Sequence, residues 1–139
     1  MAVLQPNKVY QGRWTKLLLD GEELAECYGN KAVTKLNKDT IPRCGTMMNA
    51  SLATSADNTG SLKLHKINAN IQKKLALGLK SGEMPTFTIV ETEYNKSTGG
   101  MLTKTYYGVS FDSLDWADWD ATKISGYDIA YTFDDAAYK

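Results

Sequence analysis

The chain has few of the residues that build metal, redox or disulfide-linked sites. Its 139 residues include two cysteines and one histidine. Cys27 and Cys44 do not have the spacing of a metal site. A chain of this length can bury a core without cross-links, so we expect both thiols to stay reduced. The sequence therefore predicts no metal site, no cofactor and no disulfide framework.

The sequence also lacks an excess of charge of one sign. Sixteen basic residues balance sixteen acidic ones, which argues against a dedicated DNA- or membrane-binding protein, because such proteins normally carry a basic excess. No apolar run approaches the roughly 18 residues of a membrane-spanning helix. The first residues lack the charged start and apolar stretch of a signal peptide. We expect one domain over residues 1–139, made in the cytoplasm and without a membrane anchor.

Motifs for catalysis are missing as well. His65 lies between Lys63 and Lys66, whose charges oppose an imidazolium, and it has no acidic neighbour in the sequence. The aspartates of DSLDWADWD, residues 112–120, lack the central glycine and closing glutamate of an EF-hand loop, so they predict a solvated connection. No serine, threonine or cysteine lies in a recognised nucleophile motif. An enzyme is therefore not expected.

Alternating apolar and polar residues predict a mainly β fold. The expected strands cover residues 13–19, 24–36, 47–54, 61–67, 86–92, 103–111 and 127–133. Asp20-Gly21 is a strong hairpin turn signal. Pro42 and Gly45 are expected to interrupt any strand in the polar segment 37–45, and residues 55–60 are predicted to form a turn.

Period-two alternation also assigns side chains to faces of the strands. In the strand at 61–67, Leu62 and Leu64 point to one face and Lys63 and His65 to the other. Two later strands are predicted to bury larger apolar sets: Tyr107, Val109 and Phe111 in the first, and Tyr127, Ile129, Tyr131 and Phe133 in the second.

One segment changes to a helical period. Ile67, Ile71, Leu75 and Leu79 are four residues apart, which places them along one face of a helix at about residues 69–80. Asn68 or Asn70 can cap its start and Gly82 can end it. The expected fold is an antiparallel β-sandwich or partial barrel of about seven strands with one α-helix packed on the sheet.

Two features concern association. Residues 37–58 form a hairpin extension too long for a monomer of this size, which indicates either a disordered loop or a segment docked on another chain. Residues 31–80 carry nine basic and two acidic residues, whereas residues 112–139 carry seven acidic and two basic ones. This split is either solvated surface or a pair of opposite poles suited to head-to-tail association. Trp116 and Trp119 are core or subunit anchors, or a platform for stacking a sugar.

Three segments together carry a family resemblance that spans nearly the whole chain. They are LLLDGEELAE near the start, TGSLKLH before the predicted helix, and GVSFDS with GYDIAYTFDD near the end. Their order resembles that of the tail tube proteins of contractile phages and of phage-tail-like, R-type bacteriocins, in the PBSX-type group. The segment MMNASLATSADNTG differs from the glycine- and tryptophan-bearing stretch of that group.

The resemblance implies a structural role. Members form hexameric rings in which strands from six subunits complete one larger barrel, and the rings stack head-to-tail into a hollow tube. It also implies partners: other copies of the chain, a surrounding sheath protein, baseplate and tail terminator proteins, and DNA passing through the lumen in a phage. Lys63 and His65 would then face the channel. The residues expected at contacts within or between rings are Ile41, Pro42, Met47, Met48, Leu52, Trp116 and Trp119.

Two alternatives stay open at this stage. The chain could instead be a soluble β-sandwich that binds a ligand or carbohydrate, using Trp116 and Trp119. Within the tube class, the sequence does not distinguish a phage tail from a bacteriocin particle. In either case the resemblance implies synthesis in a bacterial cytoplasm, followed by assembly into a particle.

Overall fold

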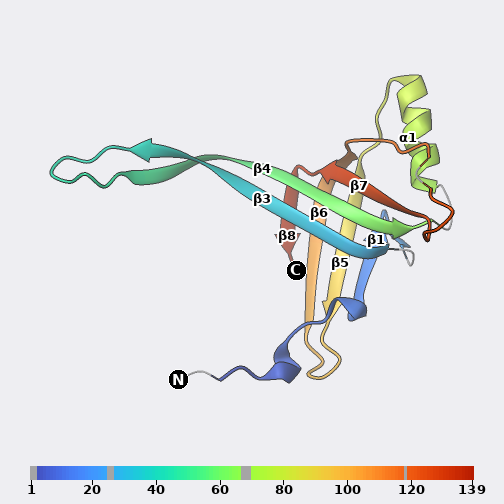
Figure 1. Ribbon diagram of the computed structural model, residues 1–139, viewed down its shortest axis with the longest axis horizontal. Coiled ribbons are helices and arrows are strands. Elements are labelled where there is room, and N and C mark those ends of the chain that lie inside the picture. Colours follow the sequence, from blue (N-terminus) through green and yellow to red (C-terminus); the bar gives the residue numbers. More distant parts are fainter. Residues whose placement is uncertain (1–2, 25–26, 67–69, 118) are drawn as a thin grey trace.

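Eight strands and one α-helix make up the fold of the part of the chain that the structure describes. The computed structural model describes residues 3–24, 27–66, 70–117 and 119–139. Two short 3₁₀ turns, Pro6–Lys8 and Gly12–Trp14, precede the sheet. In chain order the elements are β1 (Thr15–Leu19), β2 (Glu22–Glu23), β3 (Cys27–Ile41), β4 (Ala50–His65), α1 (Asn70–Ser81), β5 (Phe87–Tyr94), β6 (Met101–Phe111), β7 (Gly126–Thr132) and β8 (Asp135–Tyr138) (Figure 1).

All strand pairs are antiparallel, in the order β2-β1-β5-β6-β7-β4-β3, with β8 paired to β6. β6 joins the two halves of the sheet. It pairs with β5 over most of its length and with β8 from Lys104 to Tyr107, and only Ser110 and Phe111 at its end pair with β7. The sheet thus folds over on itself without closing. The predicted fold, a mainly β partial barrel or sandwich with one helix, is confirmed.

Buried side chains from five strands, from the helix and from Phe133 just after β7 form one core. They are Leu17, Leu19, Leu62, Leu64, Ile71, Leu75, Phe87, Ile89, Tyr106, Val109, Phe111, Tyr127, Ile129, Tyr131 and Phe133. The predicted burial of Leu62 and Leu64, and of the four aromatic and aliphatic residues between Tyr127 and Phe133, is confirmed. These segments keep a strict period of two, so their faces could be assigned correctly from sequence.

A bulge in β6 reverses one of the predicted faces. The sequence placed Tyr107 with Val109 and Phe111, but Tyr106 is buried and Tyr107 is exposed. The register with β5 shifts between Tyr106 and Val109, and Gly108 has a φ of 65°. One additional residue in a strand shifts its alternation by one position, and a glycine tolerates the left-handed backbone that this requires.

The hairpin of β3 and β4 is longer than the sequence indicated. Residues 55–60, predicted as a turn, lie inside β4, and the polar segment after residue 36 continues β3 as far as Ile41. Pro42 and Gly45 do lie in the loop between these strands. Asparagine, aspartate and glycine favour turns locally, but here the backbone of the facing strand supplies partners from Cys27 to Ile41, with register shifts after Cys27 and after Asn37.

α1 packs on the core through Ile71, Leu75 and Gly78. Leu79, which was predicted to point inward, is 56% exposed. Seven residues make almost two whole turns, so position 78 returns to the face of position 71, whereas position 79 is rotated by about 80° from it. Gly82, at a φ of 81°, ends the helix as predicted, and its N–H bonds to the carbonyl of Gly78 at 2.9 Å. Ile67 and Asn68, assigned to the start of the helix, lie outside the described residues.

Among the described residues, no helix is long and apolar enough to cross a membrane.

Candidate functional site

The hairpin of β3 and β4 extends far beyond the rest of the sheet (Figure 1). β4 pairs with β7 only from Thr59 to His65. Beyond Thr59 the two strands of the hairpin pair only with each other, out to Ile41 and Ala50. We call this projecting part, residues 34–58, the arm. It carries no core residue, so it adds nothing to the burial that stabilises the fold.

Polar side chains link the two strands of the arm. The Thr34 hydroxyl donates to Asn58 Oδ1 at 2.7 Å. The Asn37 amide donates to Ser55 Oγ and to Asp57 Oδ2, both at 3.0 Å. An isolated two-stranded hairpin is only marginally stable in water, and cross-strand pairs of this kind add to its stability. The arm is therefore built as an ordered ribbon without a hydrophobic layer beneath it.

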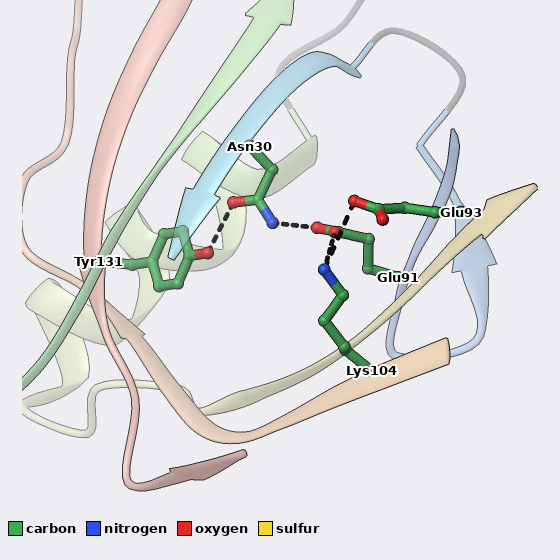
Figure 2. Close-up of polar contacts among 5 residues, drawn as sticks. All are labelled: Asn30, Glu91, Glu93, Lys104 and Tyr131. Atoms are coloured by element: carbon green, nitrogen blue, oxygen red, sulfur yellow. Dashed lines mark hydrogen bonds and ion pairs between the residues drawn. The ribbon is translucent and has the colours of Figure 1, made fainter. Parts of the chain in front are cut away.

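A polar cluster fastens the base of the hairpin to the opposite half of the sheet (Figure 2). Tyr131 donates its hydroxyl proton to Asn30 Oδ1 at 2.6 Å, and the Asn30 amide donates to Glu91. Lys104 Nζ lies 3.4 Å from Glu91 and 3.4 Å from Glu93. We call these five residues the base cluster. It joins β3 and β7 to β5 and β6, and Glu91 is only 5% exposed.

Burial and charge change the proton affinities of groups in and beside the base cluster. Burial lowers the pKa of Lys104, but the carboxylates of Glu91 and Glu93 raise it by more, so its pKa lies above the ordinary value. Burial, together with the charge of Glu91, raises the pKa of Tyr106 to about 12. Burial also raises the pKa of Tyr131. At neutral pH these groups therefore remain an ammonium and two neutral phenols, which suits a structural contact.

Sequence reasoning missed the base cluster, although a signal was present. Phe87 and Ile89 fix the core-facing side of β5, and the same alternation places Glu91 and Glu93 on that side. Acidic residues that continue an apolar strand face are seldom buried without a partner. The pattern could have indicated that a cation, here Lys104, lies opposite.

The predicted contact residues form two exposed groups. One lies at the distal end of the hairpin: Ile41, Pro42, Met47, Met48 and Leu52. The other is Trp116 and Trp119, which are 75% and 72% exposed and so are not core residues. They belong to the connection between β6 and β7, residues 112–125, which lies at the opposite end of the molecule from the hairpin tip (Figure 1). Asp118 in that connection lies outside the described residues.

The two predicted channel-facing residues are exposed together on β4. Lys63 is paired in register with Asp128 of β7. The His65 ring stacks on Tyr28 with 4.3 Å between ring centroids. Among the described residues, no group of three histidine, cysteine or acidic side chains could hold a metal ion. This surface therefore offers charged groups and a stacked pair of rings.

The chain has a projecting arm, an open sheet, and large apolar side chains exposed at both ends. These features are typical of a subunit that assembles with other chains. A family model described as "Phage tail tube protein" matches residues 2–138. The chain belongs to the phage tail tube family. The predicted resemblance is confirmed, and the family decides against the ligand-binding alternative: the chain is a tail tube subunit, a structural protein and not an enzyme.

Relatives of this tail tube subunit include protein XkdM of the phage-like element PBSX of Bacillus subtilis (strain 168). It is 28% identical over 134 residues, which are 95% of this chain and 91% of XkdM. Among solved structures, a chain of the PVC sheath-tube complex, an extracellular contractile injection system in its extended state, has a TM-score of 0.75 at 11% identity. The alignment covers 95% of the tail tube subunit and 92% of that chain.

A second solved structure has the same fold. A chain of the PVC sheath/tube terminator in the extended state matches with a TM-score of 0.71 at 16% identity, over 99% of both chains. At these identities the likeness shows a shared fold, which extends over essentially the whole tail tube subunit.

Proposed function

We propose that this tail tube subunit forms hexameric rings that stack head-to-tail into the hollow inner tube of a contractile injection particle. The observation that carries the proposal is the arm. It is ordered by cross-strand hydrogen bonds, it projects beyond the sheet, and Met47 at its tip is fully exposed. A rigid ribbon with an apolar tip is costly for a solitary subunit and useful to one that reaches a neighbour.

The open sheet supports closure into a ring. β3 is the last strand in the sheet order, so its outer edge faces no other strand among the described residues. A long unpaired edge favours pairing with another chain. In a ring, each such edge would pair with an adjacent subunit, and strands from six subunits would complete one larger barrel.

We assign the exposed face of β3, β4 and β7 to the channel wall. Lys63 and His65 lie on it, and Asp128 is the register partner of Lys63. Opposite charges placed side by side reduce the net charge that the wall presents. A wall of this kind would suit a conduit, because a strongly basic lining would hold nucleic acid by its phosphates.

The proposed contacts use the two exposed groups at the ends of the molecule. Between rings we assign the hairpin group, Ile41, Pro42, Met47, Met48 and Leu52, and the aromatic pair Trp116 and Trp119. Head-to-tail contacts are heterologous, so they need two different surfaces on one chain. Such surfaces are present at opposite ends.

Further partners follow from the same role. The PVC chains of the same fold come from a sheath-tube complex and from a sheath/tube terminator. We infer that this subunit, synthesised in a bacterial cytoplasm, assembles with a sheath, a baseplate and a terminator protein, and that DNA passes through the lumen if the particle is a phage tail.

The ring is tested by the mass of the smallest stable assembly. Six chains of 15.4 kDa give about 92 kDa, and sedimentation equilibrium of the purified chain should show this species or multiples of it. A species of one chain at every protein concentration and salt concentration would contradict the proposal.

A further inference from the structure

β3, the strand that leads into the arm, lies over the opposite half of the sheet with little apolar packing. Among the described residues, the buried core takes none of its members from β3, whose Cys27 and Ala32 pack against it only partly buried. Two hollows are lined both by β3 and by strands of the opposite half. One of about 480 Å³ includes Gly29 and Leu17, and one of about 210 Å³ includes Ala32 and Tyr106. Close packing therefore does not fix the orientation of β3.

The Asn30 side chain bridges the two halves in this region. It accepts a hydrogen bond from the Tyr131 hydroxyl at 2.6 Å and donates one to Glu91, which pairs with Lys104 of β6 (Figure 2). Tyr131 reaches Asn30 across β4 at Gly60, where a Cβ would lie 2.7 Å from its hydroxyl. Hydrogen bonds are directional and apolar contacts are not. This bridge therefore restricts the orientation of β3 more closely than apolar contact does.

A second asparagine attaches the other strand of the hairpin. Asn58, where the arm begins on β4, donates its amide to the Asp134 carbonyl at 3.3 Å and accepts from the Thr34 hydroxyl at 2.7 Å. Asp134 is itself held to β6, since its N–H donates to the Tyr107 carbonyl at 2.9 Å. Each strand of the hairpin is thus tied, through its own asparagine, to the half of the sheet that contains β6.

The length of the arm amplifies any change of direction at its base. Ile41, where β3 ends, lies eleven residues beyond Asn30, which is roughly 36 Å at about 3.3 Å per residue. A rotation of about 10° at the base therefore moves the end of the strand by about 6 Å. This displacement exceeds the separation of about 4 Å that defines a side-chain contact.

We propose that Asn30 and Asn58 are positioning residues that hold the arm in one direction relative to the half of the sheet containing β5 and β6. β4 pairs with β7 only from Thr59 to His65, so the asparagines supplement a short ladder at the point where the arm leaves the sheet. A direction set before contact lowers the entropy lost on association. The use of this direction in stacking rests on the proposed function, whereas the fixed direction itself does not.

Pulsed electron paramagnetic resonance on dissociated subunits measures the direction of the arm. One spin label is placed on Cys44, which is exposed in the loop between β3 and β4, and one on Ser97→Cys in the exposed turn between β5 and β6. Cys27→Ser removes the remaining thiol and retains a hydrogen-bond donor. We expect one narrow distance distribution. The double variant Asn30→Ala, Asn58→Ala should broaden it by about 6 Å or more, the displacement expected for a 10° swing.

Matched variants separate movement of the arm from damage to the fold. Asn37→Ala should leave the distribution narrow, because the bonds that Asn37 donates join the two strands of the arm to each other. Tyr131→Phe removes one hydroxyl and retains the ring in the core, so it is a milder test of the same bridge and should also broaden the distribution. A label pair on Lys73→Cys of α1 and Ser97→Cys, with both natural cysteines replaced by serine, should keep its distance in the double variant.

Stacking gives an independent readout. If about a tenth of the double-variant subunits have the competent direction, the concentration at which rings stack should rise about tenfold, and it should not change in Asn37→Ala. A distribution equally narrow, or equally broad, in the parent and the double variant would overturn the positioning role and leave the proposed function intact. A parent chain that forms no rings would overturn the proposed function alone, because the distances would still report the direction of the arm.

Discussion

Glu91 and Glu93 contact the same lysine at the same distance, yet they differ in their exposure to water. Each lies 3.4 Å from Lys104 Nζ, with side chains 7% and 28% exposed. Only Glu91 also accepts a hydrogen bond from Asn30 at the base of the hairpin. Leaving a buried charge without partners lowers the free energy of unfolding far more than leaving an exposed charge without them. Substitutions of Glu91 and Glu93 therefore distinguish a structural role of the base cluster from ordinary pairing of surface charges.

We therefore expect Glu91→Gln to lower the free energy of unfolding by about 1–3 kcal/mol, because an amide cannot satisfy both Lys104 and Asn30. Glu93→Gln, the matched control of identical shape change, should cost less than about 1 kcal/mol. Urea denaturation of the dissociated subunit measures both values. Equal losses for the two variants would mean that the burial of Glu91 does not matter.

The raised pKa values in and around the base cluster predict sensitivity to alkali. The folded-state pKa of Tyr106, about 12, exceeds its ordinary value of 10.0, and the pKa of Lys104 is also raised. The stability from these groups is fully present below about pH 10 and is lost as the pH rises through the folded-state pKa values. The free energy of unfolding should fall from about pH 10 toward pH 12, and the fall should be shallower in Tyr106→Phe. An unchanged free energy over this range would contradict the account.

At the scale of elements, the arm is separable from the fold that carries it. It contains none of the core residues, and Leu36 pairs directly with Ala56. Replacing residues 37–55 by Asn-Gly, the pair preferred in two-residue hairpin turns, should close the shortened hairpin at that rung without changing its register.

This shortened chain should keep a folded β-sheet circular dichroism spectrum, with the signal of the removed strand residues lost, and its thermal unfolding midpoint should stay the same because no buried apolar contact is removed. It should form no stacked tubes in sedimentation or electron microscopy. Ser51→Ala, which leaves the length and tip of the arm unchanged, serves as the control and should stack. Long assemblies from the shortened chain would show that stacking does not use the arm.

Local sequence patterns predicted elements well where one periodicity acts alone. The strand ending near Phe133 and the inward positions Ile71 and Leu75 follow directly from periods of 2 and 3.6. The prediction for Tyr107 failed because a bulge at Gly108 shifts the alternation, and a lone glycine does not reveal such a shift. Residues 55–60 have a turn-like composition, and only their pairing with the distant β3 makes them a strand.

At the scale of the whole molecule, the chain is markedly asymmetric. The arm tip lies at one end, and α1 and the connection between β6 and β7 lie at the other (Figure 1). The charge split read from the sequence, basic in residues 31–80 and acidic in residues 112–139, does not follow these two ends, because Lys73, Lys74 and Lys80 lie on α1, at the same end as the acidic connection. The positions of the ends could not be derived from sequence, because they depend on how far β3 and β4 extend beyond β7.

The most direct test of the central claim is electron microscopy of the purified chain, with rotational averaging of end-on views. The account predicts hollow rings with six-fold symmetry and, in side views, tubes built from such rings at a regular axial repeat. Solid particles, rings of another symmetry, or single subunits under all conditions of protein and salt concentration would contradict it.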